Sequence, residues 1–124
     1  DEKLPAGDLS EKEVIVVDHN SKAPQAVENI TFRNIRIEAH PSYDGFMSGK
    51  FIAFRSKNVT VKNWLFENIT ILDKNADEGD IHGTATSPIN GITFKNLEMG
   101  GKKVMSLKEA NMDVNEFAKN VRFE

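Results

Sequence analysis

The chain has 124 residues, no cysteine, and 16 basic against 19 acidic residues, which gives a formal net charge of −3. The length favours one domain, and the absence of cysteine excludes disulfides and thiolate metal sites. Basic and acidic residues are mixed along the chain, so it lacks the basic stripe typical of nucleic-acid binding. No apolar run approaches the length of a membrane span.

The chain opens with a polar segment and a short apolar run. Residues 1–13 are charged and contain proline and glycine, which predicts a loop or a disordered terminus. The β-branched run Val14 to Val17 predicts a strand buried on both faces. Asp18 to Ser21 and then Pro24 predict a loop before the next strand.

The next segment repeats along the chain. Asn29 to Ile37, N-I-T-F-R-N-I-R-I, alternates apolar and polar residues and predicts a strand. The alternation slips once, so a bend at Asn34 is needed to return both halves to one core. Similar segments follow at steps of 34, 28 and 29 residues and begin at Asn63, Gly91 and Asn120. Copies at this spacing cannot bury their apolar faces singly, so they predict stacked windings.

These repeats predict an all-β fold, a parallel β-helix of about four coils over residues 14–124. Stacking would place Ile30, Trp64 and Ile92 in one column, with Trp64 in the core. A leucine-rich repeat is the alternative, but it needs stricter spacing and more leucine than this chain has.

Asparagine recurs at one position in three copies, Asn34, Asn68 and Asn96. Stacked turns would place these amides one above another, so that each side chain bonds the next.

Two shorter signals lie between and after the copies. Ile81 to Gly83 precedes its copy as Phe51 to Ala53 does, which predicts equivalent strands. Ser106 to Glu109 matches a capping box and predicts a short C-terminal helix, which would cover an open sheet edge.

The repeats V-E-N-I-T-F-R-N-I-R-I, S-K-N-V-T-V-K-N-W-L-F-E-N-I-T-I and S-P-I-N-G-I-T-F-K-N-L-E-M resemble the late coils of pectin-lyase-like right-handed β-helices. The stretch from G-G-K-K-V-M-S-L-K-E-A-N-M to the end resembles the C-terminal end of dextranase-like and polygalacturonase-like glycoside hydrolases. The resemblance covers the chain from Val14 onward. It implies a right-handed coil, a polysaccharide partner, and an extracellular or periplasmic location.

In such families the catalytic carboxylates lie in middle coils, in motifs such as N-T-D, D-D and G-H-G, and this chain contains none of them. The resemblance therefore implies the C-terminal β-helix portion of a polysaccharide-degrading enzyme, which shapes the cleft without catalytic residues of its own. The alternative is a non-catalytic carbohydrate-binding or structural module. Its open coil ends would stack on a partner chain or self-associate.

The acidic residues of the repeats allow two interpretations. Glycoside hydrolysis needs two carboxylates flanking the scissile bond. Opposite charges on neighbouring strands are also ordinary sheet stabilisers, and we favour that interpretation. The four carboxylates are Glu28, Glu38, Glu67 and Glu98, and the basic residues that would pair with them are Arg33, Arg36, Lys62 and Lys95.

The loops supply candidate carbohydrate-binding residues. His40, Tyr43 and Asp44 share one loop, where a tyrosine would stack on a sugar ring and the others would bond its hydroxyls. Arg55 follows a predicted strand and would bind an acidic sugar, or form a salt bridge. The alternative for the loop residues is simple exposure at the surface.

A candidate calcium site lies in the acidic loop Asp73, Asn75 and Asp77, which has the D-x-N-x-D start of a calcium loop. Glu78 stands where that motif needs glycine and Thr84 where it needs glutamate, which favours a solvated turn. No other cofactor is expected, and no zinc site, because the histidines lack partners at ligand spacing.

Overall fold

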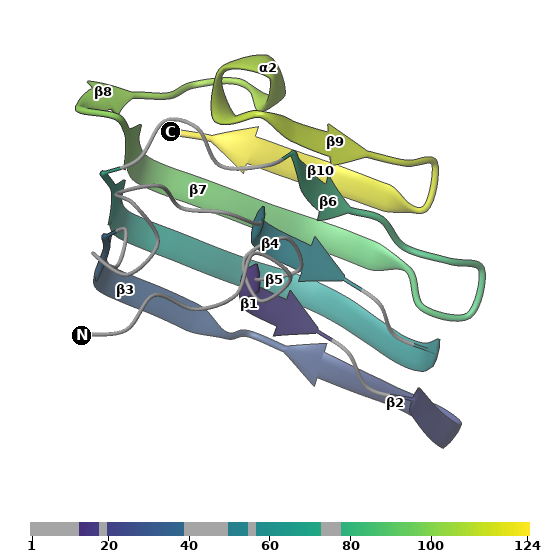
Figure 1. Ribbon diagram of the computed structural model, residues 1–124. Coiled ribbons are helices and arrows are strands. Elements are labelled where there is room, and N and C mark those ends of the chain that lie inside the picture. Colours follow the sequence, from purple (N-terminus) through teal and green to yellow (C-terminus); the bar gives the residue numbers. More distant parts are fainter. Residues whose placement is uncertain (1–12, 18–19, 39–49, 55–56, 73–77) are drawn as a thin grey trace, which may run out of the picture.

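The computed structural model describes residues 13–17, 20–38, 50–54, 57–72 and 78–124, which are mostly strand (Figure 1). The strands form two sheets, here called the short sheet and the long sheet. The short sheet is parallel, and its strands in spatial order are β1 (Glu13–Val17), β4 (Lys50–Phe54), β6 (Gly79–Ile81) and β9 (Met112–Val114). The prediction of an all-β chain with parallel strands is confirmed.

The long sheet is built from the repeated segments. Its parallel strands are β2 (Asn20–Glu28) and β3 (Thr31–Ile37), which both pair with β5 (Lys57–Ile71), then β7 (Ile89–Met99) and β10 (Ala118–Phe123). A further short strand, β8 (Lys102–Lys103), pairs antiparallel with the end of β7.

The chain alternates between the two sheets. It runs from β1 to β2 and β3, from β4 to β5, from β6 to β7, and from β9 to β10, so each passage places one strand in the short sheet and the next strand or strands in the long sheet. Figure 1 shows the strands of the short sheet pointing opposite to those of the long sheet. The interior between the sheets is apolar, and side chains such as Ile52, Phe66, Ile81 and Phe94 are fully buried there.

Equivalent residues of the repeats lie side by side. Trp64 is aligned with Ile92, and the Leu65 amide donates to the Ile30 carbonyl at 2.9 Å, so the predicted column is confirmed. Trp64 is buried as predicted, with 5% of its surface exposed. A second column is aromatic, with successive ring centroids 4.8, 5.0 and 5.0 Å apart, and consists of Phe32, Phe66, Phe94 and Phe123.

Asparagines with positive φ bend the backbone within the strands of the long sheet. Asn34, Asn68 and Asn96 have φ of 57°, 55° and 58°, so the predicted bend is confirmed. Asparagine tolerates this left-handed region better than most residues. The predicted amide ladder is also confirmed, since Asn68 Nδ2 donates to Asn34 Oδ1 at 3.0 Å and Asn96 Nδ2 to Asn68 Oδ1 at 2.9 Å.

Two local predictions are wrong. Pro24 lies within β2 rather than in a loop. Among the described residues β2 is at the edge of its sheet, and its register with β5 shifts between Asn20 and Gln25, so Pro24 lies at an irregularity of the kind that tolerates proline. The short strand expected at Ile81 to Gly83 is β6, which pairs with β4 as the predicted equivalence requires, but the predicted register is wrong by three residues because Ala53 is aligned with Asp80. A short apolar run does not determine which residues of the neighbouring strand it is aligned with.

A short helix, α2 (Leu107–Ala110), follows β8 and contacts β9 (Figure 1). The Ser106 side chain accepts from the Glu109 amide at 3.1 Å, which confirms the predicted cap. Glu109 accepts in turn from the amide of Met105, one residue before the cap, at 3.0 Å. No helix in the described part of the chain is long and apolar enough to cross a membrane.

Candidate functional site

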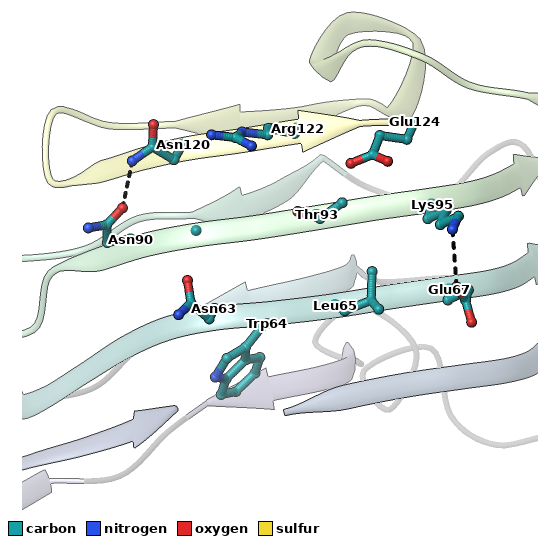
Figure 2. Close-up of a pocket in the computed structure, with 11 residues that line it drawn as sticks. Asn63, Trp64, Leu65, Glu67, Asn90, Thr93, Lys95, Asn120, Arg122 and Glu124 are labelled. Atoms are coloured by element: carbon teal, nitrogen blue, oxygen red, sulfur yellow. Dashed lines mark hydrogen bonds and ion pairs between the residues drawn. The ribbon is translucent and has the colours of Figure 1, made fainter. Parts of the chain in front are cut away.

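A hollow of about 460 Å³ lies on the outer face of the long sheet, across β5, β7 and β10 (Figure 2). The parallel register aligns its lining side chains in rows, because equivalent positions of the three strands lie next to one another. The rows are Asn63, Gly91 and Asn120; Leu65, Thr93 and Arg122; and Glu67, Lys95 and Glu124.

Gly91 opens the hollow. It has a φ of +90° and stands in a row whose other members are asparagine. A Cβ at this position would meet the Asn63 Oδ1 atom at 3.0 Å and the Asn63 backbone nitrogen at 3.3 Å. The middle of the row therefore has no side chain, and Asn120 bonds instead to Asn90, Nδ2 to Oδ1, at 2.7 Å (Figure 2).

Glu67 is held by cations at the opposite end of the hollow. Its Oε1 atom accepts from Arg33 Nε at 2.6 Å, and its Oε2 atom lies 3.7 Å from Lys95 Nζ. Only 19% of the Glu67 side chain is exposed. The interpretation of Glu67 as a cross-strand ion pair is confirmed.

Basic residues also lie beside the other repeat carboxylates. Glu38 pairs with Arg36 at 2.6 Å on its own stretch of chain, rather than with a residue of a neighbouring winding. Glu28 is aligned with Lys62. Glu98 is aligned with Lys103 of β8.

Arg122 lies in the middle row of the hollow, on the edge strand β10. It is exposed, and its neighbour in register is Thr93. Within the described ranges no hydrogen bond or ion pair joins its guanidinium to another side chain. Arg122 is therefore a cation of the hollow that forms no ion pair within the described ranges.

Trp64 lies below the hollow but offers no stacking surface. Its ring turns away from the hollow into the core, and its Nε1 atom donates to the Val27 carbonyl at 2.9 Å (Figure 2). The lining of the hollow is therefore mainly polar, with Leu65 as its outward apolar residue.

A second polar cluster lies near the short sheet. His82 Nε2 is 2.7 Å from Asp113 Oδ2, and both side chains are partly exposed. Asn115 accepts from the Gly83 amide at 3.0 Å and donates to its carbonyl at 2.8 Å. These contacts tie two windings together, and no group of three metal-ligating acidic, histidine or cysteine side chains occurs in the described residues.

The site residues expected from the sequence fall elsewhere. The carbohydrate candidates His40, Tyr43, Asp44 and Arg55 and the calcium candidates Asp73, Asn75 and Asp77 all lie outside the described residues. Their roles stay predictions. The hollow was missed, although the sequence contained one signal for it, the glycine at position 91 where the other copies have asparagine.

Comparison of the chain with protein-family models, with curated proteins and with solved structures found no match.

Proposed function

We propose that this chain is the C-terminal portion of a right-handed parallel β-helix in an extracellular or periplasmic polysaccharide-degrading enzyme. It holds carbohydrate on its outer surface and does not cleave it. The alternation of the chain between two parallel sheets supports the β-helix, because each passage places one strand in the short sheet and the next strand or strands in the long sheet. The resemblance of the repeats to the late coils of pectin-lyase-like proteins supports the polysaccharide.

The observation that carries this proposal is the polar hollow on the long sheet. Amides, a hydroxyl and charged groups line it in aligned rows on three paired strands. Such groups donate and accept the hydrogen bonds that sugar hydroxyls need. Three neighbouring strands span about 10 Å at the usual strand spacing, which suits a short stretch of a glycan chain.

The charges of the hollow support a binding role rather than a catalytic one. Cleavage of a glycosidic bond needs a pair of carboxylates that act as acid and as base or nucleophile. Here both oxygens of Glu67 face cations, and Lys95 lies between Glu67 and Glu124. The contacts of Glu67 are those of a structural ion pair.

Affinity electrophoresis tests the proposal. The protein is run through gels containing dextran, polygalacturonate or a mixed plant polysaccharide, and reducing ends are assayed in parallel. We expect at least one polymer to slow the protein and none to yield reducing ends. Gly91→Asn is the matched variant, because the equivalent positions Asn63 and Asn120 hold asparagine with φ of 56° and 57°, and a side chain at position 91 would enter the hollow. Equal retardation of wild type and variant, or no retardation at all, would contradict the proposed site, and release of reducing ends would contradict the non-catalytic role.

One observation favours a second candidate, a structural module that stacks on a partner chain. β9 and β10 are the last strands of their sheets among the described residues. Val121 and Phe123 end two core columns and are only partly buried. Open strand edges of this kind recruit further strands. Light scattering at rising concentration tests this candidate, and a monomer throughout would count against self-association.

A further inference from the structure

We propose that the ligand of the hollow is a sugar unit with one anionic group, a carboxylate or a sulfate, that binds Arg122. This inference rests on the proposed function and names the ligand class for the same site. It makes Arg122 the specificity-determining residue of the hollow and assigns the amide row to the neutral part of the ligand.

The charges in the hollow are unequally engaged. Four charged side chains line the hollow, two acidic and two basic. Glu67 is engaged with Arg33 and Lys95, at 2.6 and 3.7 Å. Arg122 has no anionic partner within the described ranges. An oxyanion of the ligand could therefore bind Arg122 without breaking an existing ion pair.

The surface beside Arg122 has room for a ligand. An exposed arginine alone is ordinary surface, but here Gly91 removes the side chain from the adjacent row on the middle strand. A ring bound over Gly91 would lie within reach of the amides of Asn63, Asn90 and Asn120, and the Thr93 hydroxyl lies next to Arg122 in register.

The guanidinium group of Arg122 suits a carboxylate or a sulfate. Its planar fork donates two parallel hydrogen bonds to a carboxylate or sulfate, which an ammonium group does not reproduce. The carboxylates of Glu67 and Glu124 occupy the row on the far side of Arg122. They would repel a second negative group there, so the ligand body extends toward the asparagine row.

Titrations followed by amide chemical shifts test the proposal. The probes are glucuronate and glucose 6-sulfate, with glucose as the neutral match and acetate and inorganic sulfate as small anions. We expect the acidic sugars to shift the amides of residues 91–93 and 120–122, and to bind at least about tenfold more tightly than glucose. Carboxylate and sulfate sources are distinguished by which acidic sugar binds.

Three variants complete the test. Arg122→Gln should weaken acidic-sugar binding about tenfold, and Arg122→Lys should restore only part of it because the fork is lost. Lys119→Gln removes the same charge from the same strand outside the hollow and should leave binding unchanged.

The possible outcomes separate this inference from the proposed function. If glucose binds as well as the acidic sugars and Arg122→Gln has no effect, the anionic ligand class is wrong while carbohydrate binding stands. If acetate and sulfate reproduce the shifts at equal affinity, the site takes an adventitious ion only, and the inference is overturned. If no probe shifts these amides, both the inference and the hollow as a carbohydrate site are overturned.

Discussion

The amide ladder gives the sharpest prediction for stability. Asn68 is its central member, and it donates to Asn34 at 3.0 Å and accepts from Asn96 at 2.9 Å. Its φ of 55° also places it in the left-handed region. Asn68→Ala removes both hydrogen bonds and leaves an unfavourable backbone, whereas Asn68→Gly removes the bonds and keeps the backbone relaxed.

The magnitudes follow from these two roles. Two hydrogen bonds contribute about 1–2 kcal/mol in total, at the low end because the amides are exposed. The left-handed conformation costs a non-glycine residue about 1–2 kcal/mol. Glycine instead adds about 0.5–1 kcal/mol of chain entropy to be lost on folding. We expect Asn68→Ala to lower the free energy of unfolding by about 3 kcal/mol and Asn68→Gly by about 2 kcal/mol.

Asn63 is the matched control. Its φ is 56°, but no side-chain hydrogen bond to it is found within the described ranges, so its variants report the backbone alone. Urea unfolding followed by far-ultraviolet circular dichroism measures the free energy of unfolding of Asn68→Ala, Asn68→Gly, Asn63→Ala and Asn63→Gly. The reasoning fails if Asn68→Gly destabilises the protein no more than Asn63→Gly, because the ladder would then contribute nothing.

Four further substitutions test the aromatic column, the helix cap and the close approach at Gly83. Phe94→Ala, inside the aromatic column, should lower the free energy of unfolding by about 3–5 kcal/mol in urea unfolding. Phe123→Ala should lower it clearly less, because Phe123 is only partly buried and has one ring neighbour; equal losses would contradict the column. Ser106→Ala should cost about 1 kcal/mol and speed amide exchange within α2 while exchange in β5 stays slow; uniform changes would exclude a local cap. A Cβ at Gly83 would lie 2.9 Å from two backbone carbonyl oxygens, so Gly83→Ala should cost about 1–3 kcal/mol, and an unchanged melting temperature would show that the turn can widen.

Much of the strand pairing was predictable because equivalent positions of the repeats carry the same kinds of residue. The slip at Asn34 required a bend, and the same residue recurs at Asn68 and Asn96, where the backbone indeed turns with positive φ. A column such as Ile30, Trp64 and Ile92 follows from aligning the copies. The opposite charges of Arg33 and Glu67 fall on neighbouring strands for the same reason.

What was not predictable depends on register and on loops. The short apolar runs around Ala53 and Asp80 do not encode which residue of one strand is aligned with which residue of the other. The hollow arises from a missing side chain at Gly91, and motif searches look for residues that are present. The expected binding residues, such as Tyr43 and Arg55, sit between the repeats, outside the described residues.

The backward turn of β8 has a consequence for growth of the stack. Lys102 and Lys103 occupy the outer edge of β7 opposite Glu98 and Met99, and the Val104 amide donates to Leu97. An added strand would therefore find the last residues of β7 already paired, and the six residues of β10 beside them. The strands also shorten along the long sheet, from 15 residues in β5 to 11 in β7 and 6 in β10, and a short edge strand offers fewer free backbone groups to an added strand.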